Sequence, residues 1–176
     1  IGSARLKALW GLGLQFFNFI PYIGQIIAIV GFVLYSMAIY SVSKAVASKS
    51  LFKNYIITAI IGFLGAFFFM LSIMLLDNSE HVSIGTSVIA VLLLAIIALI
   101  VAIYGYKIHA ELAGLSGSSL FLWAFCIFVV SVPFCFLFII FLGFFFFFFI
   151  PGFGGLITAW MLLFVAWWRF KKLEKR

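Results

Sequence analysis

Three amide side chains near the end of the first apolar segment come closest to forming a ligand site. Gln15, Asn18 and Gln25 flank the turn at Pro21. Amide groups donate and accept hydrogen bonds, so such a cluster can bind a small neutral solute. Polar neutral side chains in membrane helices more often hydrogen-bond to a neighbouring helix. We expect the packing role here, and the solute site is the alternative.

Charged residues and histidines lie outside the centres of the apolar segments. Asp77, Glu80 and His81 share one loop, and His109 lies in another. Ionisable groups at membrane depth usually mark a proton or ion path, so their absence argues against a pump or a proton-coupled transporter. Two carboxylates and one histidine are weak ligands for a divalent cation, and we expect a solvated turn. We predict no catalytic residue, no metal site and no cofactor.

Other reactive or aromatic residues favour packing roles. Cys126 and Cys135 are nine residues apart, which places them on opposite sides of a helix, so they cannot pair within one helix. A run of six phenylalanines covers every face of a helix, so part of it must contact lipid or a partner protein. This predicted surface comprises Phe144, Phe145, Phe146, Phe147, Phe148 and Phe149. A flat lipophilic molecule, a quinone or carotenoid, is the other occupant considered.

The composition requires an apolar solvent around the chain. Of 176 residues, 68% are hydrophobic and 9% are charged. Soluble domains have about 45–50% apolar and about 25% charged residues, and a chain this size could not bury such an excess. We therefore predict an all-α integral membrane protein that forms one domain over 1–176. Its net charge of +7 reflects basic loops, and we expect no nucleic-acid partner.

Six apolar segments can supply membrane spans, which need about 20 residues each. The first is short, and a re-entrant or interfacial helix is its alternative. The fifth is too long, and we expect a kink at Pro133 or a break near Gly143. The predicted segments are Ala8–Phe19, Gly24–Ser43, Leu51–Leu76, Ile84–Tyr106, Leu120–Phe148 and Gly154–Trp168.

The basic residues lie at alternate boundaries of these segments. Arg5 and Lys7 precede the first, Lys107 follows the fourth, and a basic tail spans 169–176. Cytoplasmic loops are enriched in Lys and Arg, so both termini are predicted to be cytoplasmic. The basic residues predicted to face anionic lipid are Lys44, Lys49, Lys53, Arg169, Lys171, Lys172, Lys175 and Arg176. We thus expect a multi-pass protein of the cell membrane with bound lipids.

Short repeated words suggest three helical hairpins, 1–45, 50–111 and 119–170. Phe-Ile-Pro at 19–21 recurs at 149–151, and Ser-Leu-Phe at 50–52 recurs at 119–121. In the second word we expect the serine to cap the following helix. Stripes of small residues, such as Ala95, Ala98 and Ala102, would let helices approach closely. Trp160, Trp167 and Trp168 fit an interfacial anchor.

The same words carry a resemblance to a known family. The stretches 19–24, 43–55 and 110–121 resemble the membrane proteins grouped as domain of unknown function 996. The phenylalanine run departs from that pattern. The resemblance implies a multi-pass topology and an archaeal type of protein, and it assigns no activity.

These observations lead to three hypotheses. The first is a non-catalytic membrane subunit or scaffold that packs against helices of other integral membrane subunits. The second is a small channel or facilitator for a neutral solute at Gln15, Asn18 and Gln25. The third is a subunit that binds a lipophilic cofactor, a quinone or carotenoid, and it lacks a polar group to hold a headgroup.

Overall fold

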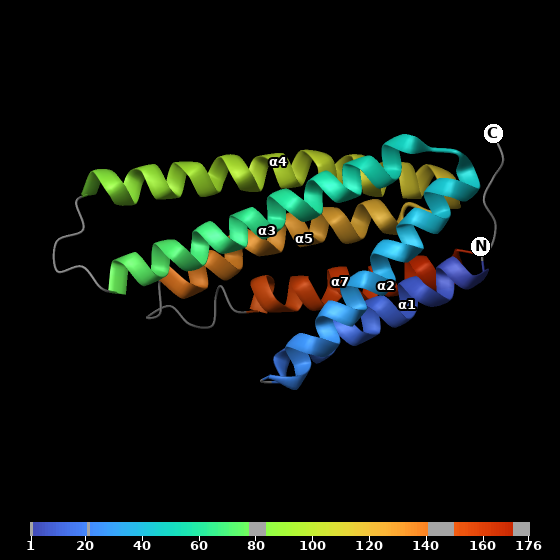
Figure 1. Cartoon of the computed structure of the whole chain (residues 1–176), viewed down its shortest axis with the longest axis horizontal. Helices are drawn as coiled ribbons and strands as arrows, with labels where there is room; N and C mark the ends of the chain where they lie inside the picture. Colours follow the sequence, from blue (N-terminus) through green and yellow to red (C-terminus); the bar gives the residue numbers. More distant parts are fainter. Residues whose placement is uncertain (1, 21, 78–83, 141–149, 171–176) are drawn as a thin grey trace. The chain divides into compact units, whose positions relative to one another are not determined.

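The chain is helical over nearly all of the residues that the computed structural model describes, which are 2–20, 22–77, 84–140 and 150–170 (Figure 1). No strand occurs in these ranges, so the predicted all-α class is confirmed. Four helices are long and apolar enough to cross a membrane: Ile23–Val46, Lys49–Ser72, Val91–Ser116 and Pro151–Arg169. The six spans and their orientation stay predictions.

Two compact units make up the chain: 1–52 with 109–176, and 53–108. The first unit contains α1 (Gly2–Gln15), a short 3-10 turn η1 (Phe16–Phe19), α2 (Ile23–Val46), α5 (Leu120–Ile140), a π turn η2 (Ile150–Gly154) and α7 (Gly155–Arg169). The second contains most of α3 (Lys49–Asp77) and of α4 (Ile84–Ser116). Each unit is described separately below.

Helices α1 and α2 form a hairpin (Figure 1). Their backbones come into contact at two glycines, Gly11 and Gly31. A methyl group at Gly11 would lie 2.7 Å from both the Gly31 carbonyl oxygen and the Tyr35 amide nitrogen. A methyl group at Gly31 would lie 2.7 Å from the Gly11 carbonyl oxygen. Small residues allow this approach, which gives dispersion forces many partner atoms where no water drives association. The pair therefore fixes the crossing point of the two helices.

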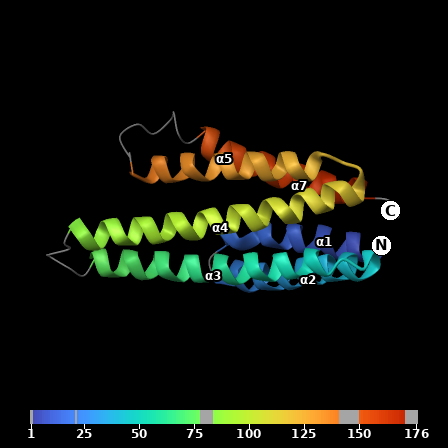
Figure 2. The same cartoon turned by 90° about the horizontal axis from the view of Figure 1, so that it is seen from above.

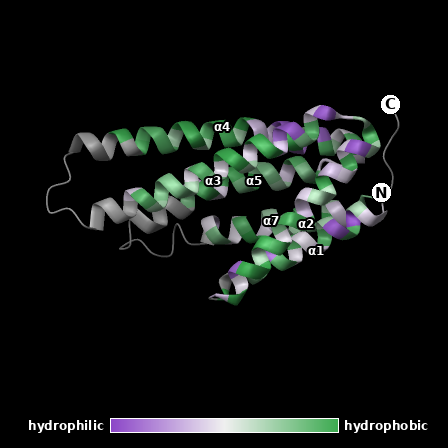
Figure 3. Cartoon of the chain, in the orientation of Figure 1, coloured by the Kyte–Doolittle hydropathy of each residue, from purple (hydrophilic) through white to green (hydrophobic). Residues whose placement is uncertain are grey.

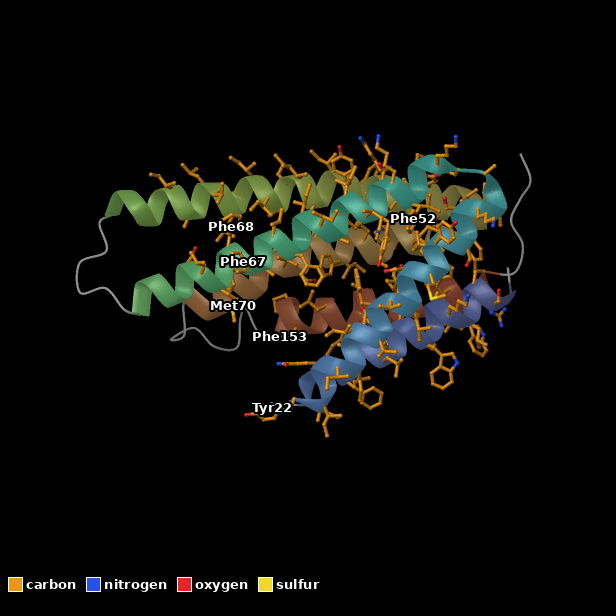
Figure 4. The ribbon with its side chains drawn as sticks, in the orientation of Figure 1. Tyr22, Phe52, Phe67, Phe68, Met70 and Phe153 are labelled. Atoms are coloured by element: carbon orange, nitrogen blue, oxygen red, sulfur yellow. The ribbon has the colours of Figure 1, made fainter. Side chains whose placement is uncertain are left out.

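The hairpin reverses direction in a tight turn that also needs a glycine. The Gly24 amide donates to the Ile20 carbonyl at 2.9 Å, and a methyl group at Gly24 would overlap the Phe17 carbonyl oxygen. Tyr22 has a φ of 64° and projects from the tip of the hairpin (Figure 4). This close approach leaves no room for a side chain at Gly24, which explains why a glycine follows the predicted Pro-containing turn.

Helix α1 is too short to be counted among the four spanning helices. Its 14 residues reach about 21 Å at 1.5 Å per residue, against a hydrocarbon core of about 30 Å. The predicted span Ala8–Phe19 changes to a 3-10 turn at Phe16. An interfacial or re-entrant α1 thus stays the alternative to a full span.

Helices α5 and α7 lie side by side in the same unit (Figures 1 and 2). A methyl group at Gly155 would overlap the Ser131 hydroxyl, so a glycine also marks this contact. Helix α5 continues through Pro133 to Ile140. The predicted break near Gly143 lies outside the described residues.

Helices α3 and α4 form the second unit, and most of their side chains are uncovered. Gly65 on α3 faces Ile97 on α4, where a methyl group would lie 2.7 Å from the Ile97 Cγ2. Large apolar side chains such as Phe67 and Met70 stand away from α3 (Figure 4). In α3 and in α4, only 11% of an 18-residue apolar stretch is buried. The corresponding share in α2 is 28%. Other helices or lipid must therefore cover these surfaces.

Candidate functional site

The turn between α2 and α3 is closed by a serine network. Helix α2 ends at Ala47, whose φ of 56° is left-handed, and the Ser48 amide donates to the Ser43 carbonyl at 3.0 Å. The Leu51 amide donates to the Ser48 hydroxyl at 3.3 Å, which satisfies one of the free amides at the start of α3. Ser48 is thus the cap, and the prediction that Ser50 performs this role was wrong.

Glu111 from α4 accepts hydrogen bonds at the same turn. The Ser48 hydroxyl donates to it, and the Ser50 hydroxyl lies 3.2 and 3.1 Å from its two carboxylate oxygens. A carboxylate near a helix N-terminus is stabilised by the partial positive charge of the helix dipole. Glu111 therefore ties the end of α4 to the start of α3.

A buried aromatic cluster holds the end of α7 in place. Trp167 is 0% exposed and packs edge-on against Phe121 at 5.5 Å and Tyr35 at 6.0 Å between ring centroids. Its indole N–H donates to the Tyr35 hydroxyl at 3.4 Å, and Phe170 lies 5.2 Å from it. Trp167 is therefore a core residue, and its assignment to an interfacial anchor was wrong.

The neighbouring tryptophan is on the outside of the unit. Trp168 is 59% exposed, and the Arg5 guanidinium carbon lies 5.5 Å from the centroid of its ring. This distance is within the range of a cation–π interaction. The hydrophilic residues of this unit are found mainly at the start of α1 and around the α2–α3 turn (Figure 3). Trp168 thus has the exposure expected of an interfacial residue.

Two residues of the predicted amide cluster, Gln15 and Gln25, lie at different heights along the α1–α2 hairpin. The Gln15 Cγ lies against Gly31, 3.1 Å from where a methyl group would be. Gln25 is exposed in the first turn of α2, and the side chain of Asn18 lies outside the described residues. Gly31 is six residues beyond Gln25, about 9 Å along the helix. The Gln15 side chain therefore lies in the contact between α1 and α2, and the solute-site alternative stays a prediction.

The other predicted surfaces are described only in part. Lys44, Lys49, Lys53 and Arg169 are all exposed, as contact with water or headgroups requires. Outside the described residues are the phenylalanine run Phe144, Phe145, Phe146, Phe147, Phe148 and Phe149 and the tail residues Lys171, Lys172, Lys175 and Arg176.

Hydroxyl groups in the apolar helices bond within their own helix. The Ser36 hydroxyl donates to the Phe32 carbonyl at 2.8 Å, and the Ser131 hydroxyl donates to the Ile127 carbonyl at 2.6 Å. Ser41, Thr58, Ser72 and Thr158 each donate to the carbonyl four residues earlier. Each of these hydroxyls thus finds a carbonyl partner one turn away in its own helix.

Metal ligands do not gather in the described part of the chain. No three His, Cys, Asp or Glu side chains there could share an ion. His109 stacks on Phe125 with ring centroids 5.0 Å apart, and Cys126 is a free thiol on an exposed surface. Glu80 and His81 lie outside the described residues. The described side chains thus support packing and surface contacts.

Three features of this unit were missed by sequence reasoning: the contacts of Glu111, of Arg5 and of Trp167. Glu111 is an acidic residue in an otherwise basic loop region, and that contrast was an available signal. The partners of Arg5 and Trp167 are distant in the sequence, so no local pattern marks them.

No family model, curated protein or solved structure matches the chain.

Proposed function

We propose that this chain is a non-catalytic integral membrane subunit or scaffold that packs against helices of other membrane proteins. In this proposal six spans form three hairpins, both termini are cytoplasmic, and the protein resides in the cell membrane. The resemblance to domain of unknown function 996 is part of the same proposal. The exposed small residues of α4 are the observation that carries it.

Ala95 and Ala98 lie on one side of α4 and are exposed. Small side chains give no advantage in contact with lipid chains. They favour contact with a second helix, because its backbone can then approach closely. Farther along the same side, Gly105 is buried. The exposed part of the stripe is therefore suited to the close approach of another helix. We assign the partner as an apolar helix of another membrane subunit.

The hydrogen bonding of the apolar helices also supports a role in packing. The described hydroxyls donate to carbonyls of their own helix, so they offer few free polar groups to a moving solute. An 18-residue apolar stretch in each of the four candidate spans holds no more than two Asp, Glu, Lys or Arg residues. A channel would need polar groups along its path, and a quinone or carotenoid site would need a cavity with fixed polar contacts.

The exposed lysines are consistent with the proposed orientation. Lys44 and Lys49 flank the α2–α3 turn, and Lys53 lies one turn into α3. Basic residues near a membrane surface each contribute about 1 kcal/mol to attraction by anionic lipid. A cytoplasmic location for this turn would place them beside such lipids.

Crosslinking tests the docking face directly. A photoreactive residue at Ala98 is expected to capture a protein of the same membrane. The matched control is Ile96, which is 56% exposed and points about 160° away around the helix. We expect lipid adducts there. Mass spectrometry of the adducts from native membranes is the measurement. Equal protein capture at both positions, or lipid alone at Ala98, would contradict the proposal.

A further inference from the structure

Arg5 has an aromatic partner and lacks an acidic one in the described part of the chain. Its guanidinium lies over Trp168. The chain has four acidic residues, and Glu111 is the only one described in the unit that contains Arg5. The Glu111 carboxylate accepts hydrogen bonds from Ser48 and Ser50. Among the described residues, no carboxylate neutralises the charge of Arg5, so its guanidinium is suited to binding an external anion.

Apolar side chains exposed on the same two helices limit what that anion can be. Leu6 and Trp10 on α1 are exposed, and so are Met161 and Trp168 on α7. A soluble anion would leave these surfaces uncovered. A phospholipid covers them with its acyl chains and places its phosphate at the level where Arg and Trp side chains gather at membrane surfaces.

We propose that Arg5 and Trp168 form a binding site for the headgroup of an anionic phospholipid. A guanidinium held over an aromatic ring keeps N–H donors along its edge, and these match the oxygens of a phosphate. The indole N–H of Trp168 is a further donor to the headgroup or to an ester carbonyl. Arg169, exposed and next in the chain, adds a second positive charge.

This site differs from a general basic surface because two distant helices form it. Arg5 is on α1 and Trp168 is on α7, so a bound lipid would link the first and last described helices of the unit. The inference rests on the membrane location in the proposed function and not on the docking of a partner protein. A failed crosslink at Ala98 would leave it standing.

The test is native mass spectrometry of the full chain in mild detergent, titrated with phosphatidylglycerol and with phosphatidylcholine of the same acyl chains. We expect tighter binding of phosphatidylglycerol, and Arg5→Gln should weaken it about fivefold. Lys7→Gln is the control, since Lys7 loses the same charge but lies about 160° around α1. Arg5→Lys should fall between wild type and Arg5→Gln.

Each alternative has a distinct outcome. Equal weakening by Arg5→Gln and Lys7→Gln would show diffuse attraction and overturn the site, as would equal affinity for the two lipids. Displacement of phosphatidylglycerol by excess inorganic phosphate would show a free-phosphate site and overturn the lipid assignment. Trp168→Leu gives a second variant if Arg5→Gln fails to fold, and it should also weaken the binding of phosphatidylglycerol.

Discussion

Gly11→Leu is expected to force α1 away from α2 and to lower the free energy of unfolding by about 3 kcal/mol, the upper part of the range for overpacking. Even the first carbon of the new side chain would lie 2.7 Å from backbone atoms of Gly31 and Tyr35. Backbone atoms inside a helix cannot move aside alone, so the whole helix must shift. Equilibrium unfolding in detergent, followed by circular dichroism, measures the loss.

Gly13→Ala is the matched control on the same helix. A methyl group at Gly13 meets no atom within 4 Å. Alanine also favours helix over glycine by about 0.5–1 kcal/mol, so this variant should be as stable as wild type or slightly more so. An equal loss for the two variants, or no loss for Gly11→Leu, would show that the close crossing of α1 and α2 does not decide the result.

Trp167→Ala is expected to have the other large effect, about 3 kcal/mol. Truncation of a buried tryptophan costs about 3–5 kcal/mol in soluble proteins. The lower end applies here, because lipid solvates apolar groups and the loss is mainly one of packing. Trp167 is fully enclosed by Tyr35, Phe121 and Phe170. The cavity left behind would remove contacts from α2, α5 and α7 together.

The adjacent Trp168→Ala provides the comparison, since Trp168 is exposed and lipid or detergent replaces its contacts. Its cost should be under about 1 kcal/mol, the range of an exposed cation–π pair. Thermal unfolding of both variants in the same detergent gives the ranking. A loss for Trp168→Ala as large as that for Trp167→Ala would show that the aromatic cluster does not form the core of this unit.

The helical class was predictable because the hydropathy of a segment indicates whether water or lipid surrounds it. Long apolar runs such as 23–46 and 91–116 form helices, since only a helix satisfies its own backbone groups in lipid. The end of the first segment was less predictable. Residues Phe16–Phe19 form a 3-10 turn, although they continue the apolar segment that begins in the α-helix before them.

The site residues were predictable only where their role is local. Residue type alone did not locate the helix crossing: Gly11 and Gly13 are both glycines of α1, and only Gly11 lies against α2. Capping by Ser48 instead of Ser50 depends on where α2 ends, which is fixed by the left-handed Ala47. The pairs Ser48–Glu111 and Arg5–Trp168 join residues far apart in the sequence, and no local pattern specifies such a contact.

Aromatic residues showed the same limit. Trp167 and Trp168 are neighbours of the same type, yet one is buried and one is exposed. They differ by 100° around α7, and only the positions of α2 and α5 decide which of them faces the core. Hydropathy and residue type are identical for the two, so neither could separate a core residue from an interfacial one.

The membrane topology is tested most directly by cysteine labelling in intact cells. Single cysteines are introduced as Lys49→Cys and Ser79→Cys in a chain whose Cys126 and Cys135 are replaced by alanine, and a membrane-impermeant maleimide is added outside. We predict that Ser79→Cys reacts in intact cells and that Lys49→Cys reacts only after the membrane is opened. Reaction of Lys49→Cys in intact cells would contradict the account.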